Sequence, residues 1–207
     1  MIYLNIYLII IIMLKSSKDL FINSTLPYDS FKIIETNTDG SCCYNSIYKL
    51  LLLNNKINNK ITTKHIQNNA VKWLEENRNL YLNNFNMTVE EYVLFNHNLD
   101  SFEQYLKYYK IYSGNNKNIL IDRYGGIPEI IALSNIYNIN INIYTGKTYR
   151  KHKIIKGAII NNKPRKDLRF QLLLNITPLY KSNNINEYNI FYYETKNYKH
   201  FYALDII

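Results

Sequence analysis

The chain has 207 residues, of which 47% are hydrophobic, so it can bury the core of one ordinary globular domain. Its net charge of +9 makes anionic partners worth considering, but the basic residues are scattered apart from short clusters at 150–153 and 163–166. The two cysteines are adjacent, which excludes a disulfide framework and favours a reducing compartment. Two cysteines and four separated histidines also exclude a typical zinc site.

Residues 2–14 are almost wholly apolar, but thirteen residues are too few for an ordinary membrane span. The length fits a signal-peptide core, although no basic residue precedes the segment and no small-residue cleavage site follows it. An element packed on the domain, a signal or weak anchor, and a wrongly assigned start codon all stay open. We divide the chain into an apolar segment with a linker at 1–27 and a folded domain at 28–207. We expect a cytoplasmic protein, with a secretory or membrane-associated location as the alternative.

The first two thirds of the chain are predicted to be mainly helical. An apolar run at 31–35 precedes a turn signal at Asp39-Gly40. A helix then begins near Cys43 and ends at Asn54, because apolar residues recur at helical spacing: Tyr44, Ile47, Tyr48 and Leu51. Further helices are predicted over 63–82, after a capping box at 88–91, over 100–109, and after Gly125-Gly126 with Pro128 in the first turn.

The last third is predicted to form strands, because β-branched, aromatic and alternating residues gather at 140–144, 170–174, 189–193 and 200–204. No internal repeat is visible. Helices followed by strands predict an α+β domain.

Cys42 lies where the first long helix is expected to begin, and this position suits a nucleophile. The positive end of a helix, with its unpaired backbone N–H groups, favours the thiolate that attacks. Gly40 can adopt the backbone angles of a tight loop and leaves its N–H group exposed. The amides from Asp39 to Cys42, including that of Ser41, can therefore hold the oxyanion of a tetrahedral intermediate.

A general base is still required, and the chain offers four histidines. His65 lies in a helix pattern and is expected at the surface, His97 is expected at a helix end, and His152 lies in a basic loop. His200 begins an apolar strand and is the candidate, because nucleophile and base need to meet only in the fold. The alternative is a strand-end histidine that bonds the backbone.

Three separated segments resemble the ovarian-tumour (OTU) family of cysteine proteases, in the family's order. Residues 39–44, DGSCCY, resemble its Asp-Gly-x-Cys-Leu-Phe/Tyr signature. Residues 124–134, YGGIPEIIALS, resemble its Trp-Gly-Gly-x-x-Glu-Leu-x-Ala-Leu-Ser segment. The strand at 189–193 followed by His200-Phe201 resembles its closing strand and His-Tyr. With these segments in order, the resemblance covers roughly residues 31–205.

The resemblance implies a small central β-sheet flanked by helices, and a thiol protease that cuts after the terminal glycine of ubiquitin or a ubiquitin-like modifier. It implies Cys42 as nucleophile, His200 as general base, and the amides at Gly40 and Ser41 as oxyanion hole. Gly125 and Gly126 would shape the groove for the modifier's C-terminal tail. No metal or organic cofactor is implied, and we expect a monomer. The acidic segment from Glu90 to Glu103 is a candidate surface for the arginine-bearing tail.

Departures from the family pattern qualify these roles. Cys43 replaces the usual leucine and is interpreted as a small core residue, although Cys43 itself as nucleophile stays open. Asn45 replaces a common arginine. Tyr202 stands where many members place the Asp or Asn that orients the histidine. We therefore expect Asp39 as the third catalytic residue; its alternative role is to cap the helix or close the turn.

Two other functions stay open. An OTU-like module that binds ubiquitin without cleaving it is one, because the acid after the histidine is missing. A basic nucleic-acid-binding protein is the other, since its 21 tyrosines can stack on bases. Codon bias toward A/T explains the tyrosines, however, and no known nucleic-acid module is visible. We therefore expect no nucleic-acid partner.

Overall fold

The computed structural model describes residues 25–36, 40–110, 125–150, 153–156, 159–160, 163–164, 168–180, 185–195 and 198–207. The apolar segment at 2–14, Asp39, Tyr124 and His152 lie outside the described residues. Within the described part, no helix combines the length and apolar character that a membrane crossing requires.

The order of elements confirms the predicted α+β class, with most helices before most strands. The helices are η1 (Tyr28–Ser30), α3 (Cys42–Leu53), α4 (Thr63–Glu76), α5 (Val89–His97), α6 (Phe102–Lys110) and α7 (Ile127–Tyr137). The first strands are β1 (Leu26–Pro27), β2 (Phe31–Ile34), β3 (Tyr81–Leu82) and β4 (Met87–Thr88). The later strands are β5 (Ile139–Arg150), β6 (Lys153–Lys156), β7 (Ile159–Ile160), β8 (Lys163–Pro164), β9 (Arg169–Ile176), β10 (Asn186–Thr195) and β11 (Tyr198–Ile206).

One mixed sheet organises the described residues, in the order β1-β9-β5-β10-β11-β2 with β6 also paired to β5. β10 runs parallel to β5 and antiparallel to β11. The register places Tyr193 opposite His200 on one side of β11, and Ile34 opposite Ala203 on the other. β2 ends before it reaches the level of His200, and Thr36, two residues after β2, lies beside this histidine.

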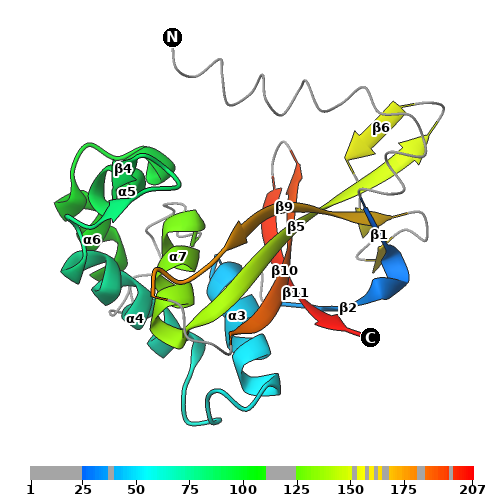
Figure 1. Ribbon diagram of the computed structural model, residues 1–207, viewed down its shortest axis with the longest axis horizontal. Helices are drawn as coiled ribbons and strands as arrows, with labels where there is room; N and C mark the ends of the chain where they lie inside the picture. The colour runs from blue at the N-terminus through cyan, green and yellow to red at the C-terminus, as the bar shows by residue number, and fades with distance from the viewer. Residues whose placement is uncertain are drawn as a thin grey trace.

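The helices and the sheet share one large core (Figure 1). α3 packs against β10 and β11, and α7 packs against α4, α5 and β5. Because strand residues alternate between faces, Phe201 and Ala203 of β11 join the core that contains α3. Leu204 joins a second aromatic cluster, which includes Phe170 and Phe191.

The helix that begins at Thr63 ends earlier than the sequence predicted. α4 stops at Glu76 instead of residue 82, because Asn77 caps it with both its backbone N–H and its side-chain amide on the Trp73 carbonyl. The chain then turns into β3, which pairs with β4 and brings Tyr81 opposite Thr88. Pairing with β4 therefore overrides the local helical pattern after residue 76.

Candidate active site

Cys42 is the first residue of α3 and is fully buried. Gly40, two residues earlier, has φ of 83°, a left-handed conformation that favours glycine. The Asn45 N–H donates to the Ser41 carbonyl at 2.8 Å, which closes the first turn of the helix. The Ser46 hydroxyl donates to the Cys42 carbonyl at 2.8 Å. A tight turn thus delivers the thiol to the positive end of a helix, where negative charge is favoured.

His200 lies near the start of β11 and is only 2% exposed. Its Nε2 atom is 2.8 Å from the Thr36 hydroxyl oxygen, and that hydroxyl also donates to the Phe201 carbonyl. The ring of Tyr202 meets the imidazole edge-on, with ring centroids 4.4 Å apart. Tyr202, two positions after the histidine, therefore supplies a ring contact and no carboxylate or amide.

The elements that carry Cys42 and His200 are packed against each other. α3 contacts both β10 and β11. Burial and the charge of Glu194 raise the pKa of Tyr192 on β10, and the neighbouring Cys42 raises it further. The Tyr192 ring in turn contacts the ring of Phe201, the residue after His200, with the ring centroids 4.9 Å apart. The fold thus brings the two candidate residues to adjoining elements, although they are 158 positions apart in the sequence.

Cys43 is buried in the core, as predicted. Burial raises the pKa of the Cys43 thiol, and the nearby Cys42 and Glu129 raise it further. A thiol in this setting stays protonated, which supports the interpretation of Cys43 as a small apolar side chain.

Gly125 packs closely against α3, whereas Gly126 lies against the start of α7. A Cβ on Gly125 would lie 3.0 Å from two ring carbons of Tyr44 and 3.1 Å from the Cys43 Cβ. Gly126 precedes α7, and its N–H donates to the Glu129 carboxylate at 2.6 Å. The role of this pair in shaping a substrate groove stays a prediction; Gly125 contacts the helix that carries Cys42, and Gly126 contacts Glu129 of α7.

A buried ion pair lies next to Gly126, at the start of α7. Glu129 accepts hydrogen bonds from His97 at 2.9 Å and from the Tyr105 hydroxyl at 2.7 Å. Burial opposes both charges, but the Glu129 carboxylate raises the pKa of His97. In turn His97, Tyr105 and the Gly126 N–H outweigh the effect of burial and lower the pKa of Glu129. His97 does end a helix, as predicted, but the sequence did not reveal its partner 32 residues away.

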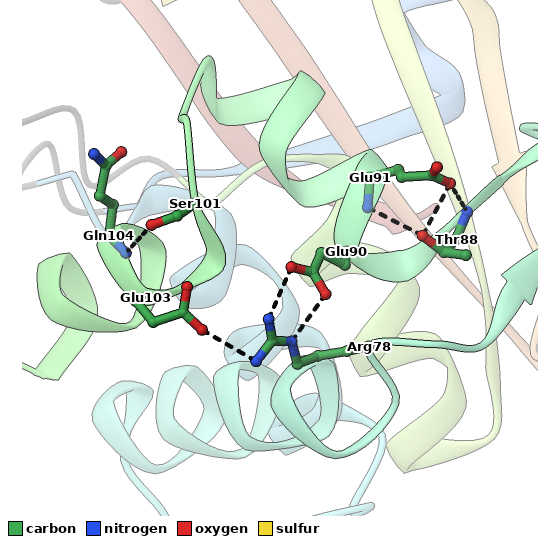
Figure 2. A network of polar contacts seen from close by, with 7 residues as sticks. All are labelled: Arg78, Thr88, Glu90, Glu91, Ser101, Glu103 and Gln104. Atoms are coloured by element: carbon green, nitrogen blue, oxygen red, sulfur yellow. Dashed lines mark hydrogen bonds and ion pairs between the residues drawn. The ribbon is translucent and has the colours of Figure 1, made fainter.

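The acidic side chains proposed for modifier binding have structural partners (Figure 2). Arg78 donates two hydrogen bonds to Glu90, at 3.0 and 2.8 Å, and one to Glu103 at 3.3 Å. Glu91 completes the predicted capping box by accepting from the Thr88 N–H at 2.7 Å. Glu90 and Glu103 thus hold α5 and α6 to the segment after α4.

His65 is exposed and caps α4 through Thr62, in agreement with the expected surface position. Thr36 and Tyr192 were not predicted as site residues. Thr36 belongs to no motif, and Tyr192 is one of many tyrosines in this composition, so only the sheet register reveals either.

Comparison with known proteins identifies the family of the chain. The family model for OTU-like cysteine protease matches residues 37–177, more than half of the chain, and ends before His200. Comparison with curated protein sequences gives no match. The structure of the OTUD1 OTU domain is similar with 13% identity and a TM-score of 0.38, over 84% of this chain and 85% of that one. The viral OTU domain protease from Farallon virus is similar with 15% identity and a TM-score of 0.40, over 86% and 85%. On the family match, the chain belongs to the OTU-like cysteine protease family.

Proposed function

We propose that the protein is a deubiquitinating cysteine protease, which hydrolyses the peptide or isopeptide bond after the C-terminal glycine of ubiquitin or a ubiquitin-like modifier. One observation carries the proposal. Cys42 begins α3 directly after the left-handed turn at Gly40, and α3 packs on the strand that bears the buried His200. A thiol at a helix start and an imidazole on an adjoining strand are the groups that thiol proteolysis requires.

The Cys42 thiol and the His200 imidazole together support an acyl-transfer reaction. His200 takes the Cys42 proton, and the thiolate sulfur bonds to the carbonyl carbon of the modifier's last glycine. Backbone N–H groups at Gly40 and Ser41 stabilise the negative carbonyl oxygen. His200 then gives its proton to the leaving amine as the C–N bond breaks, which leaves a thioester. Finally His200 removes a proton from water as the oxygen bonds to the thioester carbonyl carbon; the C–S bond breaks, and His200 returns the proton to the Cys42 sulfur, which regenerates the enzyme.

The test is reaction of the full chain with ubiquitin that carries a thiol-reactive group at its C-terminus. We expect a covalent adduct in the wild type and in Cys43→Ala, none in Cys42→Ala, and a slowed reaction in His200→Ala. Cys43→Ala is the matched control, because it removes the neighbouring thiol from the same helix turn. An adduct that persists in Cys42→Ala would contradict the proposed nucleophile.

The second candidate is a module that binds the modifier without cleaving it. Two observations favour it: Tyr202 replaces the orienting acid, and Cys42 has no exposed surface. Cleavage requires that the substrate displace whatever covers the thiol, whereas binding does not. Binding of unmodified ubiquitin by wild type and Cys42→Ala alike, with no adduct from the folded wild type, would support this candidate.

A further inference from the structure

We propose that Thr36 is the positioning residue of His200, and that it holds the imidazole with the proton on Nε2 and the basic lone pair on Nδ1. The inference rests on the proposed function for its catalytic consequence. Its structural content, the orientation and tautomer of one imidazole, can be measured independently of any activity.

The sheet places Thr36 beside the histidine. β2 ends at Ile34, which pairs with Ala203, and two further residues bring Thr36 to the level of Phe201. There the Thr36 hydroxyl reaches both the Phe201 carbonyl and Nε2 of His200, the latter at 2.8 Å. Both contacts join residues more than 160 positions apart in the sequence, so the register of β2 on β11 creates them.

The Thr36 hydroxyl has a single hydrogen, and this decides whether it donates to or accepts from each of its two partners, the Phe201 carbonyl and His200 Nε2. A threonine hydroxyl has one hydrogen to donate and can accept with its lone pairs. That hydrogen goes to the Phe201 carbonyl, which can only accept. Toward His200 the hydroxyl oxygen must therefore accept, and Nε2 must carry the hydrogen. A neutral imidazole protonated on Nε2 has its lone pair on Nδ1, so Nδ1 is the atom that would take the thiol proton.

In thiol protease sites a carboxylate often orients the imidazole of the general base. Here the Thr36 hydroxyl would orient it without adding a negative charge. The residue two positions after His200 is Tyr202, whose ring lies edge-on against the imidazole at 4.4 Å. That ring limits how the imidazole can rotate, while Thr36 selects the tautomer. A neutral acceptor stabilises imidazolium less than a carboxylate does, so we expect orientation to be its main contribution.

The experiment compares wild type, Thr36→Val and Thr36→Ser in the full chain. Valine keeps the branched shape and removes the hydroxyl, whereas serine restores the hydroxyl. The tautomer of His200 is read from long-range ¹H–¹⁵N spectra, with its signals assigned through His200→Gln. Turnover of a ubiquitin fusion is measured in parallel, with kcat and KM separated.

We expect the Nε2-protonated tautomer in wild type and Thr36→Ser, and a changed tautomer distribution in Thr36→Val. Thr36→Val should lower kcat about 10- to 100-fold, as expected for a lost hydrogen bond to a group that becomes charged, with KM within about twofold. Thr36→Ser should recover most of that loss. A general loss of folding would affect both kinetic constants and would be seen in the far-ultraviolet circular dichroism spectrum.

Several results would overturn the inference. Wild-type His200 protonated on Nδ1 would do so whatever the activity. A folded Thr36→Val with wild-type kcat and tautomer would do so as well. Asp39→Asn distinguishes the other candidate partner: if that variant changes the tautomer and Thr36→Val does not, Asp39 orients the imidazole. If the wild type cleaves no modifier, the proposed function fails, and the tautomer comparison alone decides the role of Thr36.

Discussion

The buried pair between Glu129 and His97 provides a quantitative test of how the start of α7 is held against α5. Glu129 has no exposed surface, His97 is 12% exposed, and the carboxylate accepts from three donors, those of His97, Tyr105 and Gly126. Glu129→Gln keeps the volume, removes the charge and turns one acceptor into a donor. We expect it to lower the free energy of unfolding by about 3 kcal/mol, because it removes the charged partner of a buried ion pair. This value is at the lower end of the usual range, because His97 can lose its proton and so avoid a buried unpaired charge.

For a chain of this size that loss corresponds to a fall in Tm of about 6 to 12 °C. The assay is urea unfolding followed by circular dichroism, supported by thermal unfolding. Glu76→Gln is the matched control, because Glu76 pairs with Lys72 at the surface, where both side chains are more than half exposed. The control should cost less than about 0.5 kcal/mol. A loss below about 1 kcal/mol in Glu129→Gln would refute the reasoning.

The pH dependence of this difference gives a second check. The raised pKa of His97 means that its contribution is complete below its ordinary value of 6.5 and is lost as pH rises through the higher folded value. The lowered pKa of Glu129 means that its contribution is complete above 4.5 and is lost as pH falls through the lower folded value. The cost of Glu129→Gln should therefore be greatest between pH 4.5 and 6.5 and should shrink in alkaline buffer. A cost that grows with pH would contradict the assigned charges.

Three smaller perturbations test the surroundings of Cys42 and the capping of α5, each by urea unfolding. Gly125→Ala should cost about 1 to 3 kcal/mol, because its methyl group would press on the buried Tyr44 ring at 3.0 Å; no loss would mean that the ring can move aside. Gly40→Ala should cost about 1 to 2 kcal/mol, since φ of 83° strains any side chain; an unchanged midpoint would show that the turn relaxes. Thr88→Ala should cost about 1 kcal/mol by removing the cap that bonds Glu91, and an equal loss in Thr88→Ser would count against a hydroxyl cap.

Local signals in the sequence predicted several features correctly. The α3 stripe begins at Cys42 and ends before Asn54, and the capping box at Thr88 opens α5. Gly40 has a left-handed φ, which the turn signal before Cys42 had allowed. These features depend on residues within a few positions of one another. The capping residue and the group that it bonds, or the apolar residues of one helix face, therefore lie in the same short segment of sequence.

Other features depend on partners that only the sheet and the helix packing bring together. α4 ends at Glu76 because the following residues pair with β4, and the local helical pattern does not contain that pairing. Glu129 was visible as part of a family segment, but its ion pair with His97 depends on the packing of α5 against α7.

The sequence alone determined the likeness to the OTU family, the candidate nucleophile Cys42, the candidate base His200 and the α+β class, because motifs and periodicity are properties of contiguous residues. Only the tertiary structure decided what surrounds that base. Thr36 reaches His200 across 164 positions, and this contact exists because β2 pairs with β11 in one register. A shift of one residue would turn each β2 side chain to the opposite face of the sheet, so the partner of the histidine is a property of the register.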